Sequence, residues 1–176
     1  MRKIYFTLML AAFWLLAGSG CRTVTYVHVG PNWAALHDLK PSDNAFQVTV
    51  TGRDKLTLGE EISFTVYSAK PGNLWIVQVD PKDNLTVLFP NQRVRDNYIQ
   101  AEATVRLPPQ GADWSIVANE PLGPSVIAFI VVRGEADLNQ ALGQKDGMAK
   151  ALSLASESPS WGLAKLIVEV KGKEEK

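Results

Sequence analysis

Short alternations of apolar and polar residues dominate the chain after residue 45. Residues 46–51 and 62–67 both alternate strictly, and a period of two places the apolar side chains on one face of a strand. We therefore expect two strands that each pack one face against a core. The apolar positions are Phe46, Val48, Val50, Ile62, Phe64 and Val66.

Two other runs are apolar on both faces. Residues 74–79 contain one polar side chain, Gln78, and residues 126–132 contain none. Strands of this kind are typical of the middle of a sheet that is covered on both sides. Residues 80–84 read Asp-Pro-Lys-Asp-Asn, which is the composition of a hairpin loop. We expect residues 74–79 and 85–89 to pair antiparallel.

Further strand-like runs occupy residues 103–107, 114–118 and 163–170, and residues 171–176 form a charged end. Many short strands joined by turns predict a mainly β protein, an antiparallel β-sandwich of immunoglobulin-like or transthyretin-like type or a partly closed barrel. Between residues 134 and 160 the apolar spacing becomes helical, which predicts one or two short helices near the C-terminus.

The first twenty residues have a different order. Arg2 and Lys3 precede an uncharged stretch over residues 4–17, and small residues follow at 18–20. This three-part order predicts a secretory signal peptide over residues 1–20, because the apolar stretch is shorter than the roughly twenty residues that span a bilayer.

Cys21 directly follows these small residues and is the single cysteine of the chain. Its position resembles the lipobox of bacterial lipoproteins, in which the cysteine is acylated and the peptide is cut before it. The resemblance implies a lipid anchor on Cys21, palmitate among its acyl chains, and several chains hold a protein stably on a membrane. Arg22 stands where an Asp would retain the protein at the inner membrane, so we expect a cell-envelope location at the outer membrane, facing the periplasm.

A connector is expected over residues 21–45. Its residues Trp33, Leu36 and Leu39 have the spacing of a short helix, so it is either a helix lying on the domain or a free tether. The resulting division is a signal peptide (1–20), a lipidated connector (21–45), a β-sandwich domain (46–133), and a helical insertion with a final strand and a charged tail (134–176).

Charge and composition exclude several classes of function. Lys+Arg 18 balances Asp+Glu 18, which removes the broad attraction that nucleic acid binding requires. One cysteine and two histidines supply neither a disulfide framework nor a usual zinc site. We expect no metal and no cofactor.

Catalytic motifs are also missing from the sequence. Both histidines, His28 and His37, lie in the connector, and no nucleophile elbow, metalloprotease motif or phosphate-binding loop occurs. Asp80, Asp83 and Asn84 bring too few oxygens for calcium, so a plain turn is favoured. Asp113 and Glu120 have no spacing that pairs them. The sequence therefore predicts a protein that is not an enzyme.

The middle of the chain carries an ordered set of motifs. Gly59-Glu60 precedes the second strand, residues 88–91 read Leu-Phe-Pro-Asn, and residues 96–99 read Asp-Asn-Tyr-Ile. Pro108 and the triplet Pro-Leu-Gly at 121–123 follow. Over residues 46–133 this set resembles a bacterial domain-of-unknown-function family marked by its LFPN motif, number 4384 in that series.

The resemblance implies a compact β-sandwich that occurs on exported lipoproteins and beside bacterial kinases and caspase-like peptidases, as an accessory or recognition module without catalytic activity. The polar loop between two apolar strands is a candidate binding surface. The candidate site residues are Leu88, Phe89, Pro90, Asn91, Arg93, Arg95, Asp96 and Asn97.

We therefore expect a membrane-anchored lipoprotein whose β-sandwich binds another envelope protein in a secretion, export or signalling assembly. The alternative is a carbohydrate- or peptidoglycan-binding lipoprotein, because flat aromatic rings stack on sugars. Burial in the core is the default for such rings in strands, and Trp161, flanked by Ser, Pro and Gly, is the one most expected to be exposed. The rings concerned are Trp75, Trp114, Trp161, Phe89 and Phe129.

Overall fold

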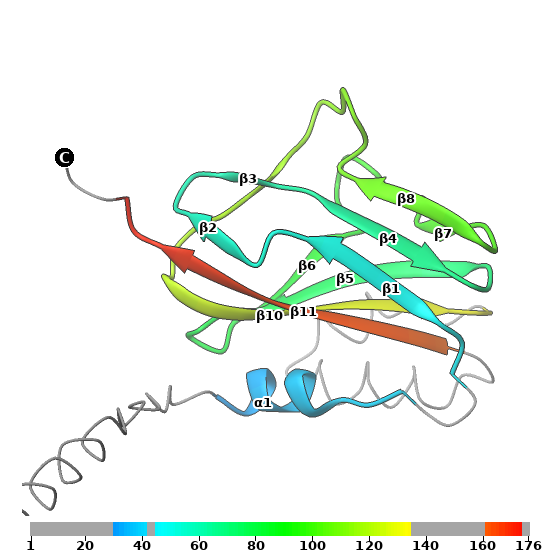
Figure 1. The fold of residues 1–176 in the computed structure, drawn as a ribbon, viewed down its shortest axis with the longest axis horizontal. Helices are drawn as coiled ribbons and strands as arrows, with labels where there is room; N and C mark the ends of the chain where they lie inside the picture. The colour runs from blue at the N-terminus through cyan, green and yellow to red at the C-terminus, as the bar shows by residue number, and fades with distance from the viewer. Residues whose placement is uncertain (1–29, 42–44, 135–160, 174–176) are drawn as a thin grey trace, which may run out of the picture.

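The computed structural model describes residues 30–41, 45–134 and 161–173 of the chain, and it is mainly β (Figure 1). Within these residues, one helix, α1 (Pro31–Asp38), precedes the strands. The strands are β1 (Val48–Gly52), β2 (Lys55–Thr57), β3 (Glu61–Ile62), β4 (Phe64–Ser68), β5 (Gly72–Val79), β6 (Leu85–Phe89), β7 (Tyr98–Ile99), β8 (Ala103–Leu107), β9 (Ile116–Val117), β10 (Gly123–Val132) and β11 (Trp161–Lys171).

The strands form three sheets. The largest has the order β2-β11-β10-β5-β6, with β7 pairing the start of β5, and a three-stranded sheet has the order β1-β4-β8. A small ladder joins β3 to β9. All pairings are antiparallel except that of β2 with β11. None of these orders closes on itself, so the described strands form no barrel.

The main core lies between the two larger sheets. Phe64 of β4 meets Phe129 of β10 edge to face, with ring centroids 5.0 Å apart. Val66 and Leu107 from the three-stranded sheet and Ile76 from β5 belong to the same buried cluster. The alternations predicted for residues 46–51 and 62–67 are confirmed, because their apolar positions face this core.

A second apolar cluster covers the opposite face of the large sheet. Trp75 and Val77 of β5 and Ile130 of β10 are buried there, together with Leu36 of α1. β5 and β10 are thus buried on both faces, as their continuous apolar runs predict. Figure 1 shows α1 along the side of β10 and β11 that faces away from the three-stranded sheet.

The predicted hairpin is confirmed: β5 and β6 pair antiparallel across residues 80–84. The strand predicted over residues 114–118 is shorter, because only Ile116 and Val117 pair with β3. β2 was not expected from the sequence. The helices predicted between residues 134 and 160 lie outside the described residues, as do the signal peptide and Cys21.

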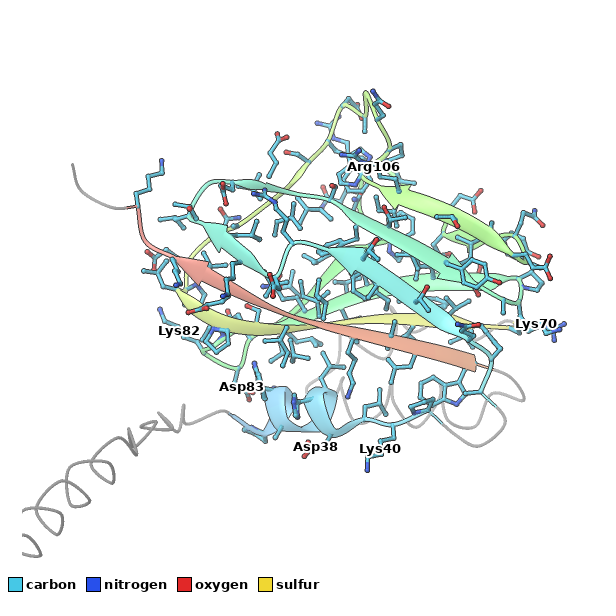
Figure 2. All side chains as sticks on the ribbon, in the orientation of Figure 1. Asp38, Lys40, Lys70, Lys82, Asp83 and Arg106 are labelled. Carbon is cyan, nitrogen blue, oxygen red and sulfur yellow. The ribbon has the colours of Figure 1, made fainter. Side chains whose placement is uncertain are left out.

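Of the two interpretations of the connector, the structure shows the short helix that packs on the domain. Side chains that are distant in the sequence bond to both ends of this helix. The Asp83 carboxylate, in the β5–β6 turn, accepts hydrogen bonds from the backbone N–H groups of Asn32 (3.2 Å) and Trp33 (2.7 Å). The Lys165 ammonium, on β11, donates to the carbonyls of His37 and Leu39. A negative charge at the N-terminus and a positive charge at the C-terminus both interact favourably with the helix dipole and stabilise the helix. Figure 2 shows Asp83 beside the start of α1.

Removing the Asp83 carboxylate should release the first turn of α1. Asp83 has φ 67°, which asparagine tolerates, so Asp83→Asn isolates the loss of charge from backbone strain. We expect Asp83→Asn to lower the free energy of unfolding by about 0.5–1 kcal/mol, because one of the two accepting oxygens becomes an NH₂ group and the negative charge at the helix N-terminus is lost. Amide hydrogen exchange of Asn32 and Trp33 should accelerate. Lys82→Ala, in the same turn, is the control and should leave both quantities unchanged; equal exchange rates in Asp83→Asn and wild type would contradict the capping role.

Candidate functional site

The loop at residues 91–97 is closed by its own polar side chains. The Asn91 side-chain oxygen accepts from the backbone N–H groups of Arg93 and Val94, both at 2.9 Å, and the Asn91 N–H donates to the Val94 carbonyl. The Asp96 carboxylate accepts from the Tyr98 N–H at 3.1 Å. Asparagine and aspartate stabilise loops in this way by replacing backbone partners. Asn91 and Asp96 therefore shape the loop rather than face a ligand.

Asn97 fastens the far end of the loop to the central sheet. Its amide nitrogen donates to the Leu74 carbonyl at 2.9 Å, and the Leu74 N–H donates to the Asn97 carbonyl at 2.8 Å. Both ends of the loop are thus tied to strands β5 and β6, which makes the loop a fixed feature of the domain edge.

The apolar part of the motif lies in or against the core. Phe89 is buried and stacks on Trp114, with ring centroids 6.4 Å apart and planes 12° from parallel. Leu88 packs against the main core, and Pro90 follows the end of β6, where its missing N–H costs no ladder bond. Of the predicted site, these three residues have an architectural role.

Arg93 and Arg95 are the members of the predicted site that remain available for contact. Both side chains are exposed. The Arg93 guanidinium lies 3.7 Å from the Asp113 carboxylate in an exposed ion pair, and no hydrogen bond or ion pair engages Arg95 in the part of the chain that the structure describes. Arg95 and Gln92 also line a shallow depression beside β6. The loop thus presents two guanidinium groups on a rigid support.

Sequence reasoning missed a groove next to this loop. It has a volume of about 710 Å³ and lies between the start of β4 and the segment that joins β8 to β9. Arg53, Arg106, Glu61, Asp113 and Trp114 supply its charged and aromatic lining. These residues are far apart in the chain, and no local spacing brings them together. The Arg93–Asp113 ion pair connects the groove wall to the loop.

Arg53 is held at the groove by the turn that contains Gly59 and Glu60. Gly59 has φ 88°, a conformation that favours glycine, and the Glu60 carboxylate accepts from the Thr57 N–H at 2.7 Å. Glu60 also pairs with Arg53 at 3.4 Å. The Thr57 hydrogen bond is the main reason that the pKa of Glu60 lies below its ordinary value; burial opposes this shift, and the Arg53 charge assists it.

In the described structure, the five candidate aromatic rings do not form an exposed platform. Trp75, Phe89 and Phe129 are buried, and Trp114 is half-buried against Phe89. The expected exposure of Trp161 is wrong: its side chain is only 2% exposed, because it begins β11 and packs in the cluster with Leu36 and Val132. The neighbouring Gly162 is not a loop residue but a point of close approach, where a Cβ would lie 2.7 Å from the Phe46 carbonyl oxygen.

The other polar candidates have structural partners. The His37 ring stacks on Trp33, with centroids 4.9 Å apart, and contacts Asp38. Asp80 accepts from the backbone of Lys82 and Asn84, as the plain-turn interpretation predicts. Within the described ranges, no three His, Cys, Asp or Glu side chains gather where they could hold a metal ion.

Residues 55–134 match the model of a family described as a domain of unknown function, DUF4384. This match supports that domain family for the part of the chain that contains β2 to β10, the loop at residues 91–97 and the groove lining other than Arg53. No curated protein matches the chain. Among residues 30–41, 45–134 and 161–173, no helix is long and apolar enough to cross a membrane.

Replacing Glu60 should weaken the fold in a pH-dependent way. The pKa of Glu60 is lower in the folded chain than its unfolded value of about 4.3, so its stabilising effect is present above that value and is lost as the pH falls through the folded pKa. We expect Glu60→Gln to have a lower Tm than wild type at pH 7, with the two converging as the pH falls well below 4. Glu102→Gln serves as the matched exposed control. A Tm difference that is independent of pH would contradict this role.

Proposed function

We propose that this chain is a lipid-anchored lipoprotein of the cell envelope, attached through Cys21 to the outer membrane, with its β domain facing the periplasm as a non-catalytic protein-binding module. One observation carries the binding role: a loop that is rigidly bonded to β5 and β6 presents Arg93 and Arg95 outward beside an open groove of about 710 Å³. The partner is expected to belong to a secretion, export or signalling assembly.

The chemistry of this surface suits a protein ligand. Arginine and tryptophan are enriched in protein interfaces, and here Arg53, Arg106 and Trp114 line one groove with Glu61 and Asp113 at its walls. Mixed charges around a half-buried aromatic ring match the polar rim and apolar centre of such interfaces. Because the loop is already ordered, binding would cost little conformational entropy.

The docked helix supports an anchored geometry. Gly30 follows Cys21 by nine positions in the sequence, which limits the distance between the two residues to about 30 Å. Gly30 lies against Asp83 in the β5–β6 turn, so that turn would be the end of the domain nearest to the membrane.

The two sheets packed across a shared core favour the sandwich interpretation, immunoglobulin-like or transthyretin-like, over a partly closed barrel.

A carbohydrate or peptidoglycan ligand is the second candidate, and Trp114 is the observation that favours it. Its ring lines the groove and is half-buried, which leaves part of it for stacking on a sugar. The other rings that this function would use are buried in the described structure. The glycan function therefore depends on one aromatic residue.

Crosslinking in intact cells followed by mass spectrometry tests the proposal. We expect the full-length lipidated chain and the Lys82→Ala control to capture the same envelope protein. The double variant Arg93→Ala/Arg95→Ala should reduce that capture at least about tenfold, which corresponds to roughly 1.4 kcal/mol of binding energy. Cys21→Ser should move the chain to the soluble fraction and lose the partner.

Two outcomes would contradict the proposal. Unchanged capture by the double variant would remove the loop from the interface. Recovery of cell-wall fragments alone, with loss of that recovery in Trp114→Ala, would replace the protein partner by a glycan.

A further inference from the structure

Strand β8 is a regular strand with one unpaired edge. It pairs with β4 over five residues without a shift in register, and the described structure gives it no second neighbour. The other outer strands are better protected. β6 faces a bulge between Ile76 and Val77 and ends at Pro90, and the Phe46 N–H beside β1 bonds to the Trp161 carbonyl. Bulges, prolines, charges and cover are the usual means of closing an edge. β8 has no register shift within its five pairs; Pro108 follows its last residue, as Pro90 follows that of β6, and Arg106 is the charged side chain on its outer face.

The hydrogen-bond alternation identifies which groups of β8 are open. The Ala69 N–H donates to the Gln47 carbonyl, which makes that pair a bonded pair of β4 with β1. Successive residues of a strand direct their N–H and C=O groups to opposite sides, so Val66 and Ser68 direct theirs toward β8. Their partners in the register are Val105 and Ala103. The residues between, Thr104 and Arg106, therefore direct their N–H and C=O groups to the open edge.

The side chains at this edge define what would fit there. Val105 faces the main core but is only partly buried, so a further strand would cover it. Arg106 lies on the outer face, is exposed, and donates only to the Ser63 hydroxyl, at 3.3 Å. Among the described residues, no carboxylate forms an ion pair with Arg106, although Glu61 and Asp113 line the same groove. Figure 2 shows Arg106 at the rim of the molecule, at the end of β8.

We propose that the open edge of β8 binds an extended segment of a partner protein as an additional strand of the three-stranded sheet. The segment alternates apolar residues, which cover Val105, with polar residues that include an acidic side chain close to Arg106. Backbone bonds to Thr104 and Arg106 supply affinity, and the acidic residue supplies selectivity, as in other cases of strand addition. This inference rests on the proposed function only in that the occupant is a protein.

Charge complementarity favours a different protein over a second copy of this chain. The antiparallel self-pairing that neutralises Arg106 places it opposite Glu102 of the second copy. Glu102 has φ 58° and is not extended, so it cannot continue a ladder. An acidic residue in a separate extended segment meets no such obstacle.

The proposal is tested on the full-length chain in detergent micelles with two synthetic peptides. Both alternate valine and threonine, and they differ only in one central outward residue, which is Glu in one and Lys in the other. Amide hydrogen exchange is followed by NMR. At saturating Glu peptide, we expect the Thr104 and Arg106 amides to exchange at least about fivefold more slowly, with Val105 unchanged because β4 already bonds its N–H. The Lys peptide should bind about fivefold more weakly, as like charges across a pair of strands repel.

Variants at the edge separate strand addition from other contacts. Thr104→Pro removes an N–H that β4 does not use and should abolish the protection, whereas Thr104→Val retains the N–H and should bind as wild type does. Arg106→Glu should reverse the preference toward the Lys peptide. Circular dichroism and Tm establish that each variant is folded.

Three results would overturn the proposal. The first is that the Glu peptide does not slow amide exchange at Thr104 and Arg106, and the second is that folded Thr104→Pro binds the peptide as wild type does. The third is protection of both amides without peptide in a chain that sediments as a dimer, which would assign the edge to a second copy. Loss of the crosslinked partner in Arg93→Ala/Arg95→Ala without peptide protection at β8 would leave the proposed function intact and refute strand addition alone. Peptide protection at β8 without any crosslinked envelope protein would support strand addition and refute the proposed function alone.

Discussion

The pairing of β5 with β10, both buried on two faces, is the constraint on which the rest of the structure depends. Seven consecutive pairs join them, from Val126 with Val79 to Val132 with Asn73. One face of this pair forms the main core with the three-stranded sheet, and the other face buries Leu36 of α1. A pair of strands in this position cannot shift register by one residue without exchanging its two apolar faces. Each layer of the domain is thus positioned by the same two strands.

The candidate surfaces lie at the edges of this rigid centre. The loop at residues 91–97 leaves β6 and returns to β5 through the bonds between Asn97 and Leu74. The groove is lined by residues of β3, β8 and the segments around them, and Arg106 lines it at the C-terminal end of β8. Binding groups concentrate in loops and strand edges on a fixed scaffold, because the scaffold already orders them before a ligand binds. Helix α1 lies on the opposite side of the large sheet, so it does not cover the groove or the edge of β8.

The sequence predicts the parts of the fold that depend on local pattern. Period-two alternation, the all-apolar runs and the Asp-Pro-Lys-Asp-Asn turn determine β1, β4, β5, β6 and β10, because the rules involved act within a few residues. The sequence does not decide whether the connector is a helix or a free tether, because Asp83, the side chain that caps the helix, is about fifty residues away. β2 escaped prediction because three residues that pair parallel with the last strand carry no local signal.

The binding role of the loop at residues 91–97 stays a prediction, and the structure shows what its residues do in the fold. Asn91 and Asn97 were expected at a binding surface, and the structure uses them to fasten the loop, which leaves Arg93 and Arg95 for contact. Gly162 suggested a loop around Trp161, whereas it permits β1 to approach β11. Such long-range approaches, like the groove formed from Arg53, Arg106 and Trp114, follow from packing that no spacing in the chain encodes.

Native-state hydrogen exchange of the unliganded chain tests most directly whether a rigid β5–β10 centre carries open surfaces at its edges. Our expectation is that the amides of β5 and β10 exchange only on global unfolding, that Val105 exchanges slowly, and that its neighbours Thr104 and Arg106 exchange rapidly. Exchange of β5 and β10 before that of β4 and β8, or equal protection of all three β8 amides in a monomer, would contradict it.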